Sequence, residues 1–128
     1  MGIEMPKVKD VMNRDFLVLS PDMVGGEAIE LMYRRNKSYA PVVEEGKLEG
    51  WVRALDLMVG CKHSKVEDLM LYIDEIKVLK EDEEISQDLI EEMVGEEVIA
   101  YPVVNKEGEV VGTLSVFDLL RYYRSPRD

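Results

Sequence analysis

Two aspartates occupy matching positions in two similar stretches of the chain, and each could recognise the hydroxyl groups of a small ligand. One stretch runs Gly50-Trp51-Val52-Arg53-Ala54-Leu55-Asp56, and the other runs Gly112-Thr113-Leu114-Ser115-Val116-Phe117-Asp118. An ionised carboxylate has two acceptor oxygens, which match a pair of neighbouring hydroxyl groups. A helix that starts beside the aspartate would add free backbone N–H groups and a positive dipole end, which favour a phosphate. Both stretches are therefore candidate half-sites for a small ligand.

Ser115 and Asp118 also have the spacing of a capping box. In a capping box the serine side chain caps the helix start, and the acidic side chain three residues later bonds back to the serine N–H. This arrangement would stabilise a helix without any ligand. The residue types leave ligand binding and helix capping equally open at this half-site.

The first stretch has Arg53 where the second has Ser115. A guanidinium group presents a fork of donors that suits phosphate oxygens, and a cation at a helix N-terminus is unfavourable unless an anion compensates it. The alternative is an ordinary ion pair between Arg53 and an acidic neighbour such as Glu49 or an exposed carboxylate of the other half of the chain. We predict that Asp56 and Arg53 form the main ligand site and that Asp118 and Ser115 form the second.

No catalytic or metal-binding set is visible in the sequence. The chain has one His and one Cys, and it lacks Gly-x-Ser-x-Gly, Walker and dinucleotide-binding glycine motifs. An enzyme would need a nucleophile or an acid–base pair held in a cleft. Cys61 and His63 lie in a short joint, and two candidate ligands are too few for a metal site. We therefore expect neither an enzyme nor a catalytic cofactor.

The half-sites belong to a longer internal repeat. The pattern at residues 8–12 returns at 66–70, the pattern at 40–43 returns at 101–104, and Asp56-Leu57 returns as Asp118-Leu119. The offset grows from 58 (residue 8 to 66) to 62 (residue 56 to 118). A period of about sixty residues in only two copies indicates one paired unit instead of a solenoid. We expect repeats at residues 1–64 and 65–128, with function where they meet.

Each copy reads as β-α-β-β-α. Short apolar runs predict strands, and amphipathic stretches between turn residues predict helices. A sheet of three strands buries little on its own, so the two copies should pack together through their sheets. The strands are expected at residues 16–19 (a buried strand or an extended entry segment), 40–43, 48–52, 76–79, 98–104 and 109–114. The helices are expected at 27–36, 54–59, 86–94 and 116–123, with Gly60 as a helix cap. The fold class is thus α/β, of the mixed α+β kind.

Charge and hydropathy exclude several functions. The net charge is −11: −1 over residues 1–64 (nine Lys and Arg against ten Asp and Glu) and −10 over residues 65–128 (seven against seventeen). Such a field repels nucleic acid, which is normally bound through clustered positive charge. No apolar run reaches the roughly 20 residues that span a bilayer. Because Cys61 is the only cysteine, a reducing compartment is expected, and the cytoplasm is the default.

From residue 8 to 123 the ordered, twice-repeated motifs resemble the CBS-domain pair, also called the Bateman module. The resemblance implies a pseudo-twofold pair of units with clefts that take adenosine ligands such as AMP, ADP, ATP or S-adenosylmethionine. It also implies frequent dimerisation. Asp118 and Asp56 would contact ribose hydroxyls, and Ser115 would contact ribose or phosphate. Adenine would lie against Phe16, Leu17, Val18, Tyr39 and Ala40 in the first copy, and against Ile76, Lys77, Val78, Ala100 and Tyr101 in the second.

Two functional hypotheses follow from the sequence. The first is a ligand-sensing module that binds an adenosine ligand between its repeats and signals to a protein effector. The alternative is an interaction scaffold with empty, degenerate clefts that works only by dimerisation. In the family, Thr often stands where this chain has Val18 and Val78.

Overall fold

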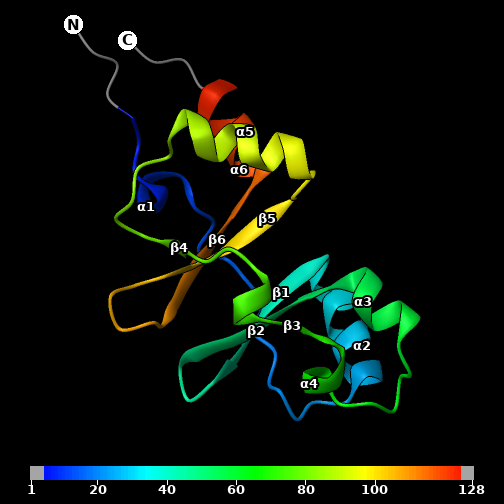
Figure 1. Cartoon of the computed structure of the whole chain (residues 1–128). Coiled ribbons are helices and arrows are strands. Elements are labelled where there is room, and N and C mark those ends of the chain that lie inside the picture. The colour runs from blue at the N-terminus through cyan, green and yellow to red at the C-terminus, as the bar shows by residue number, and fades with distance from the viewer. Residues whose placement is uncertain (1–4, 125–128) are drawn as a thin grey trace, which may run out of the picture.

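Two three-stranded sheets form the centre of the molecule, one for each repeat (Figure 1). The computed structural model describes residues 5–124. The first sheet has the order β1-β2-β3, and the second has the order β4-β5-β6. The strands are β1 Tyr39–Glu44, β2 Lys47–Arg53, β3 Leu71–Tyr72, β4 Leu79–Lys80, β5 Ala100–Val104 and β6 Val110–Ser115. The expected α/β class with two similar units is confirmed.

Two helices cover the outer side of each sheet: α2 Gly25–Arg35 and α3 Ala54–Val59 in the first unit, and α5 Gln87–Glu96 and α6 Val116–Arg124 in the second (Figure 1). The bounds of α3 agree with the prediction, and the other helices agree within three residues. Ser86 caps α5, since its hydroxyl accepts from the Leu89 N–H at 3.1 Å. Gly60 follows α3 in an extended conformation, not in the left-handed one typical of a glycine cap.

The first strand expected in each copy is shorter than predicted. Residues 16–19 form no strand, and only Leu19 pairs with Val42, through a single parallel bridge. In the second copy the strand is limited to Leu79–Lys80 and runs parallel to β5. Leu17, Leu19 and Leu79 of these segments are still buried, whereas Val18 is exposed and Phe16, Ile76 and Val78 are half-buried. The sequence therefore identified core segments correctly but overestimated their ladder of hydrogen bonds.

The segment that opens each repeat packs into the other unit, which the sequence did not predict. Helix α1, Val8–Val11, is followed by Asn13, which bridges Thr113 of the second unit. Helix α4, Val66–Leu69, leads into β3, which pairs with β2 of the first unit. We call residues 8–13 and 66–72 the exchanged segments. The core of each unit contains a valine and a methionine from the segment of the other: Val8 and Met12, and Val66 and Met70.

The repeated glycines permit this crossing. A Cβ atom at Gly50 would lie 2.5 Å from the Met70 sulfur and 2.7 Å from the Leu71 carbonyl oxygen. A Cβ atom at Gly112 would lie 2.7 Å from the Met12 sulfur. Such distances are shorter than van der Waals contact, so only glycine lets the exchanged segment pass over the strand.

The two units also meet at their hairpins. Lys47 pairs with Glu109 across the units, and its ammonium donates to the Glu107 carbonyl oxygen. The Leu48 N–H donates to the Gly108 carbonyl at 3.4 Å. Within residues 5–124, no helix combines the length and the apolar character needed to cross a membrane. The exchanged segments and the hairpins together join the repeats into one body.

Candidate functional site

A cleft of ≈ 550 Å³ lies between the two units. Ligand pockets in proteins commonly enclose about 300–1,000 Å³, so the cleft has the size of a small-molecule site. Three segments contribute to it: the end of the first sheet with the start of α3, the chain after β3, and the segment between α5 and β5. The lining residues are Ser38, Tyr39, Trp51, Arg53, Ala54, Leu55, Leu71, Glu75, Ile76, Lys77, Glu96, Glu97, Val98, Ile99, Ala100, Tyr101 and Pro102.

One wall of the cleft is aromatic. The rings of Tyr39 and Trp51 stack with their centroids 5.3 Å apart and their planes at 23°. Both residues lie on the first sheet, because Tyr39 begins β1 and Trp51 belongs to β2. A stacked pair held on a sheet offers a rigid face to a flat ring, as an adenine would need. Tyr39 was a predicted site residue, whereas Trp51 was not singled out.

Arg53 and Asp56 lie together, but they bind each other. The Asp56 carboxylate accepts from the Arg53 N–H at 3.0 Å, from Nε at 2.9 Å and from Nη2 at 2.7 Å. Burial alone would raise the pKa of Asp56, but hydrogen bonds and charge from Arg53 outweigh it and keep this pKa below its ordinary value. Only Arg53 lines the cleft. The partner of Arg53 is therefore Asp56 itself, and not Glu49 or the second repeat.

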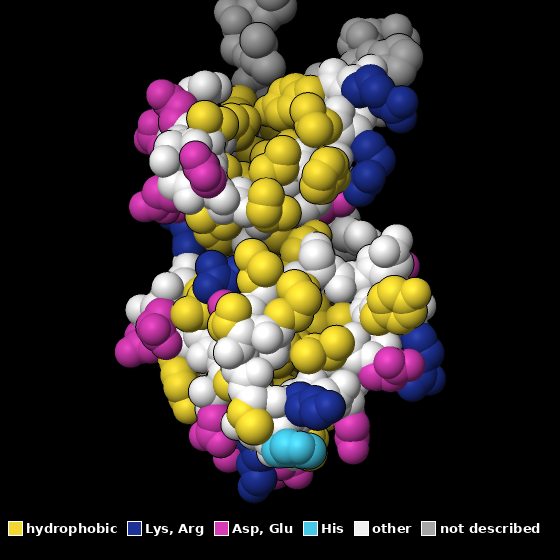
Figure 2. Space-filling model, turned by 90° about the vertical axis from the view of Figure 1, so that its right-hand side faces the viewer, with side chains coloured by type: hydrophobic (Ala, Val, Ile, Leu, Met, Phe, Trp, Pro, Cys, Tyr) yellow, Lys and Arg dark blue, Asp and Glu magenta, His cyan; other side chains and the backbone are white. Residues whose placement is uncertain are grey.

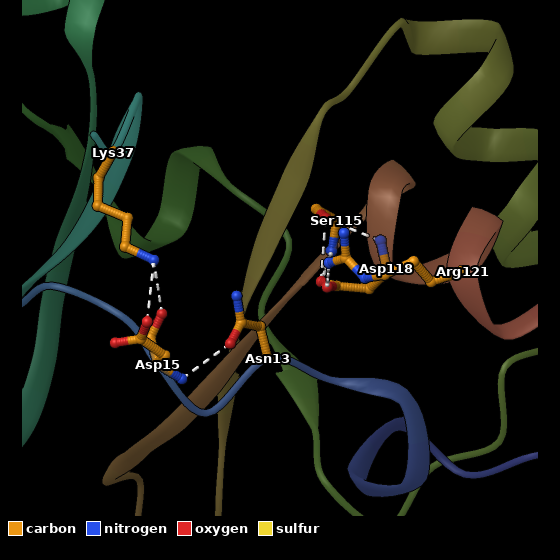
Figure 3. A network of polar contacts seen from close by, with 6 residues as sticks. All are labelled: Asn13, Asp15, Lys37, Ser115, Asp118 and Arg121. Carbon is orange, nitrogen blue, oxygen red and sulfur yellow. Dashed lines mark hydrogen bonds and ion pairs between the residues drawn. The ribbon is translucent and has the colours of Figure 1, made fainter. Parts of the chain in front are cut away.

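Ser115 and Asp118 form the capping box that their spacing allows (Figure 3). The Ser115 N–H and hydroxyl donate to Asp118 Oδ2 at 2.8 and 2.9 Å, and the Asp118 N–H donates to the serine oxygen at 3.1 Å. Arg121 donates to Asp118 Oδ1 at 2.7 Å. Asp118 is only 5% exposed. Both of its oxygens are thus engaged, and a ribose would have to displace Arg121, a partner that the sequence analysis missed.

The predicted adenine-contacting residues do not group by copy as expected. The cleft combines Tyr39 of the first copy with Ile76, Lys77, Ala100 and Tyr101 of the second. The reason is the crossing of the second exchanged segment, which carries the chain leading to Ile76 over to the first sheet. The remaining candidates do not line this cleft: Phe16, Leu17, Val18, Ala40, Val78, Ser115, Asp56 and Asp118.

A polar network borders the cleft beside Tyr101. Lys77 Nζ lies 3.1 Å from Glu92 Oε2, and the Tyr101 hydroxyl donates to the same oxygen at 3.3 Å. Burial, followed by the negative charge of Glu92, raises the pKa of Tyr101 to about 12. The Lys77 charge is therefore already balanced by a carboxylate before any ligand binds.

A second network joins the first exchanged segment to the chain after α2 (Figure 3). Lys37 Nζ donates to the Asp15 carbonyl at 2.8 Å and lies 3.8 Å from its carboxylate. The Asp15 N–H donates to Asn13 Oδ1 at 2.8 Å.

Tyr39 faces the second unit. Burial raises the pKa of Tyr39, and hydrogen bonding with Ser115 and Thr113 partly opposes that rise. Tyr39 thus contacts both units.

Among residues 5–124, no three His, Cys, Asp or Glu side chains are grouped as metal ligands would be. Cys61 is exposed.

Comparison with known proteins identifies the family of both repeats. A model of the CBS domain matches the chain twice, over residues 8–61 and 66–125. The CBS domain-containing protein MJ0729 of Methanocaldococcus jannaschii is 61% identical over 119 residues, which are 93% of this chain and 96% of that protein.

Two solved structures share the fold. The structure of CBSX2 in complex with AMP has a TM-score of 0.81 at 21% identity, covering 91% of this chain and 95% of the other. The CBS domain pair of protein MJ0100, in complex with 5′-methylthioadenosine and S-adenosyl-L-methionine, has a TM-score of 0.79 at 23% identity, covering 94% and 97%.

Proposed function

The chain belongs to the CBS-domain family, and on that basis we propose that it is a regulatory module that binds an adenosine-containing ligand in the cleft between its repeats. The candidate ligands are AMP, ADP, ATP and S-adenosylmethionine. The supporting observation is the ≈ 550 Å³ cleft whose walls come from both units and include the stacked Tyr39 and Trp51. CBS pairs with the same fold have been solved with AMP and with S-adenosyl-L-methionine.

The cleft can convert binding into a change of shape because its walls belong to different units. A ligand shifts the balance between two relative poses only if it binds them unequally. A ligand that contacts Tyr39 on one wall and Ile99 on the other would favour the pose in which both contacts form. A protein effector would then recognise that pose.

Calorimetric titration with the four ligands tests the proposal. Tyr39→Ala should lower the affinity for the ligand that binds by about 5- to 150-fold, because stacking of a base on an aromatic side chain contributes roughly 1–3 kcal/mol. Tyr33→Ala is the matched control, since Tyr33 is 82% exposed and lies outside the cleft. Absence of heat from all four ligands, or an equal effect of both variants, contradicts the proposal.

We also propose a homodimer, formed through the outer helices α3 and α6. Figure 2 shows hydrophobic side chains gathered over both units on one face of the molecule. Large apolar side chains are exposed on both helices: Leu55, Met58 and Val59 on α3, and Phe117, Leu120 and Tyr123 on α6. Exposed apolar patches of this kind commonly mark interfaces.

A second copy suits these two helices because they occupy equivalent places in the two repeats, so one twofold axis can bring both faces together. Sedimentation at several concentrations should give a dimer for the native chain and a monomer for Leu120→Asp. Tyr33→Asp, which changes an exposed ring on α2, should remain dimeric. A native monomer refutes the interface. A dimer that binds none of the four ligands would favour the interaction scaffold.

A further inference from the structure

The cleft is lined by more negative than positive side chains. Glu75, Glu96 and Glu97 all line it, and none of the ion pairs among residues 5–124 includes any of them. Glu75 accepts one hydrogen bond, from the backbone N–H of Tyr72 at 2.8 Å, which leaves its charge in place. The cleft therefore holds three negative charges without a paired cation.

The two cations of the lining are already committed. Arg53 is paired with Asp56 at 2.7 Å, and Lys77 is paired with Glu92 at 3.1 Å. Both cations are thus partly neutralised by carboxylates that lie just outside the cleft lining. An incoming ligand thus meets a negative surface, although the first repeat, taken by itself, is nearly neutral.

The acidic end of α5 is unfavourable for the helix itself. Its last residue is Glu96, and Glu97 follows in the left-handed conformation with φ 53°. The equivalent helix α2 ends at Arg35, with Asn36 in the same conformation at φ 55°. A helix C-terminus favours cations, and the left-handed region disfavours a side chain such as Glu. Departures from local preference on this scale are typical of functional positions.

We propose that this cleft selects an adenosine ligand that carries a positive charge, such as the sulfonium of S-adenosylmethionine, and rejects polyphosphates such as ATP. This inference rests on the proposed function and specifies the ligand of that same site. The three carboxylates attract a cation, and the half-buried ring of Tyr39, which stacks on Trp51, adds a cation–π contribution. A triphosphate would bring several like charges into the same space.

Titrations with S-adenosylmethionine, uncharged 5′-methylthioadenosine, AMP and ATP test the selection. At low salt, S-adenosylmethionine should bind at least about tenfold more tightly than ATP, and this ratio should shrink as added salt screens the charges. The double variant Glu96→Gln/Glu97→Gln should reduce the ratio. The control Glu91→Gln/Glu107→Gln removes the same charge from exposed positions outside the cleft and should leave the ratio unchanged.

The outcomes separate the two proposals. If AMP or ATP binds as tightly as S-adenosylmethionine, or if both double variants change the ratio equally, the charge selection is wrong and the adenosine-binding module stands. If none of the four ligands binds, the proposed function fails together with the selection. Circular dichroism of each variant verifies that it is folded.

Discussion

Replacing Gly112 by alanine should destabilise the protein because the new methyl group would collide with the first exchanged segment. The added Cβ would lie 2.7 Å from the Met12 sulfur and 3.0 Å from both Met12 Cγ and the Asn13 carbonyl oxygen. The Gly112 backbone does not lie in the left-handed region, so this collision is the source of the effect. Overpacking of this kind costs about 1–3 kcal/mol.

The identity of the colliding side chain allows a double-mutant cycle. Met12 is buried in the core of the second unit, so Met12→Ala alone should cost about 2–5 kcal/mol. If the two changes were independent, the double variant would lose their sum, about 3–8 kcal/mol. Because the alanine at residue 12 no longer meets the new methyl group, the double variant should lose about 1–2 kcal/mol less than that sum.

Urea unfolding of the four proteins, followed by circular dichroism, measures the coupling. Gly112→Ala combined with Met70→Ala serves as control, because Met70 lies against Gly50 instead. The control pair should be additive within about 0.5 kcal/mol. Additivity for Met12, or equal coupling for Met12 and Met70, would show that the segment at residues 8–13 does not cross β6 as described.

Three further predictions follow from single contacts. Gly95→Ala should raise the free energy of unfolding by about 0.5–1 kcal/mol, since nothing lies within 4 Å of the added Cβ in the last turn of α5. The pKa of Asp56 in the folded protein lies below its ordinary value of 3.8, so the ionised carboxylate stabilises the fold. In an acid titration, the native chain should exceed Asp56→Asn in stability by a constant amount above pH 3.8. This difference should vanish as the pH falls through the folded pKa. Tyr101 has an ordinary pKa of 10 and a folded pKa of about 12, so its hydroxyl ionises first in the unfolded state. Stability should therefore fall as the pH rises from 10 to about 12. Tyr101→Phe should remove this contribution to alkaline unfolding.

Local patterns predicted the helices well. The helix at residues 54–59 was predicted correctly because its apolar stripe begins after Arg53 and stops at Gly60. Both signals are local, since they lie within a few residues of each other in the sequence. The capping box of Ser115 and Asp118 was visible for the same reason. The pairing of Arg53 with Asp56 could also have been found, since residues three apart on a helix start are neighbours.

Long-range contacts were not predictable in this way. Glycine is needed at residues 50 and 112 because a segment of the other repeat passes over each position. The periodicity of apolar residues in the sequence does not reveal that contact. The charge of the cleft could not be predicted from the net charge of either half of the chain, because the cleft beside Arg53 takes Glu96 and Glu97 from the acidic half.

Because of the exchanged segments, each half of the chain needs residues of the other half to complete its core. A fragment that ends in the joint at residues 61–65 would lack Val66 and Met70 and would expose the hole in its core that they fill. Two such fragments, produced separately and mixed, should recover the native fold by complementation, whereas each alone should aggregate or remain unfolded. The molecule should accordingly unfold in a single cooperative transition and not repeat by repeat.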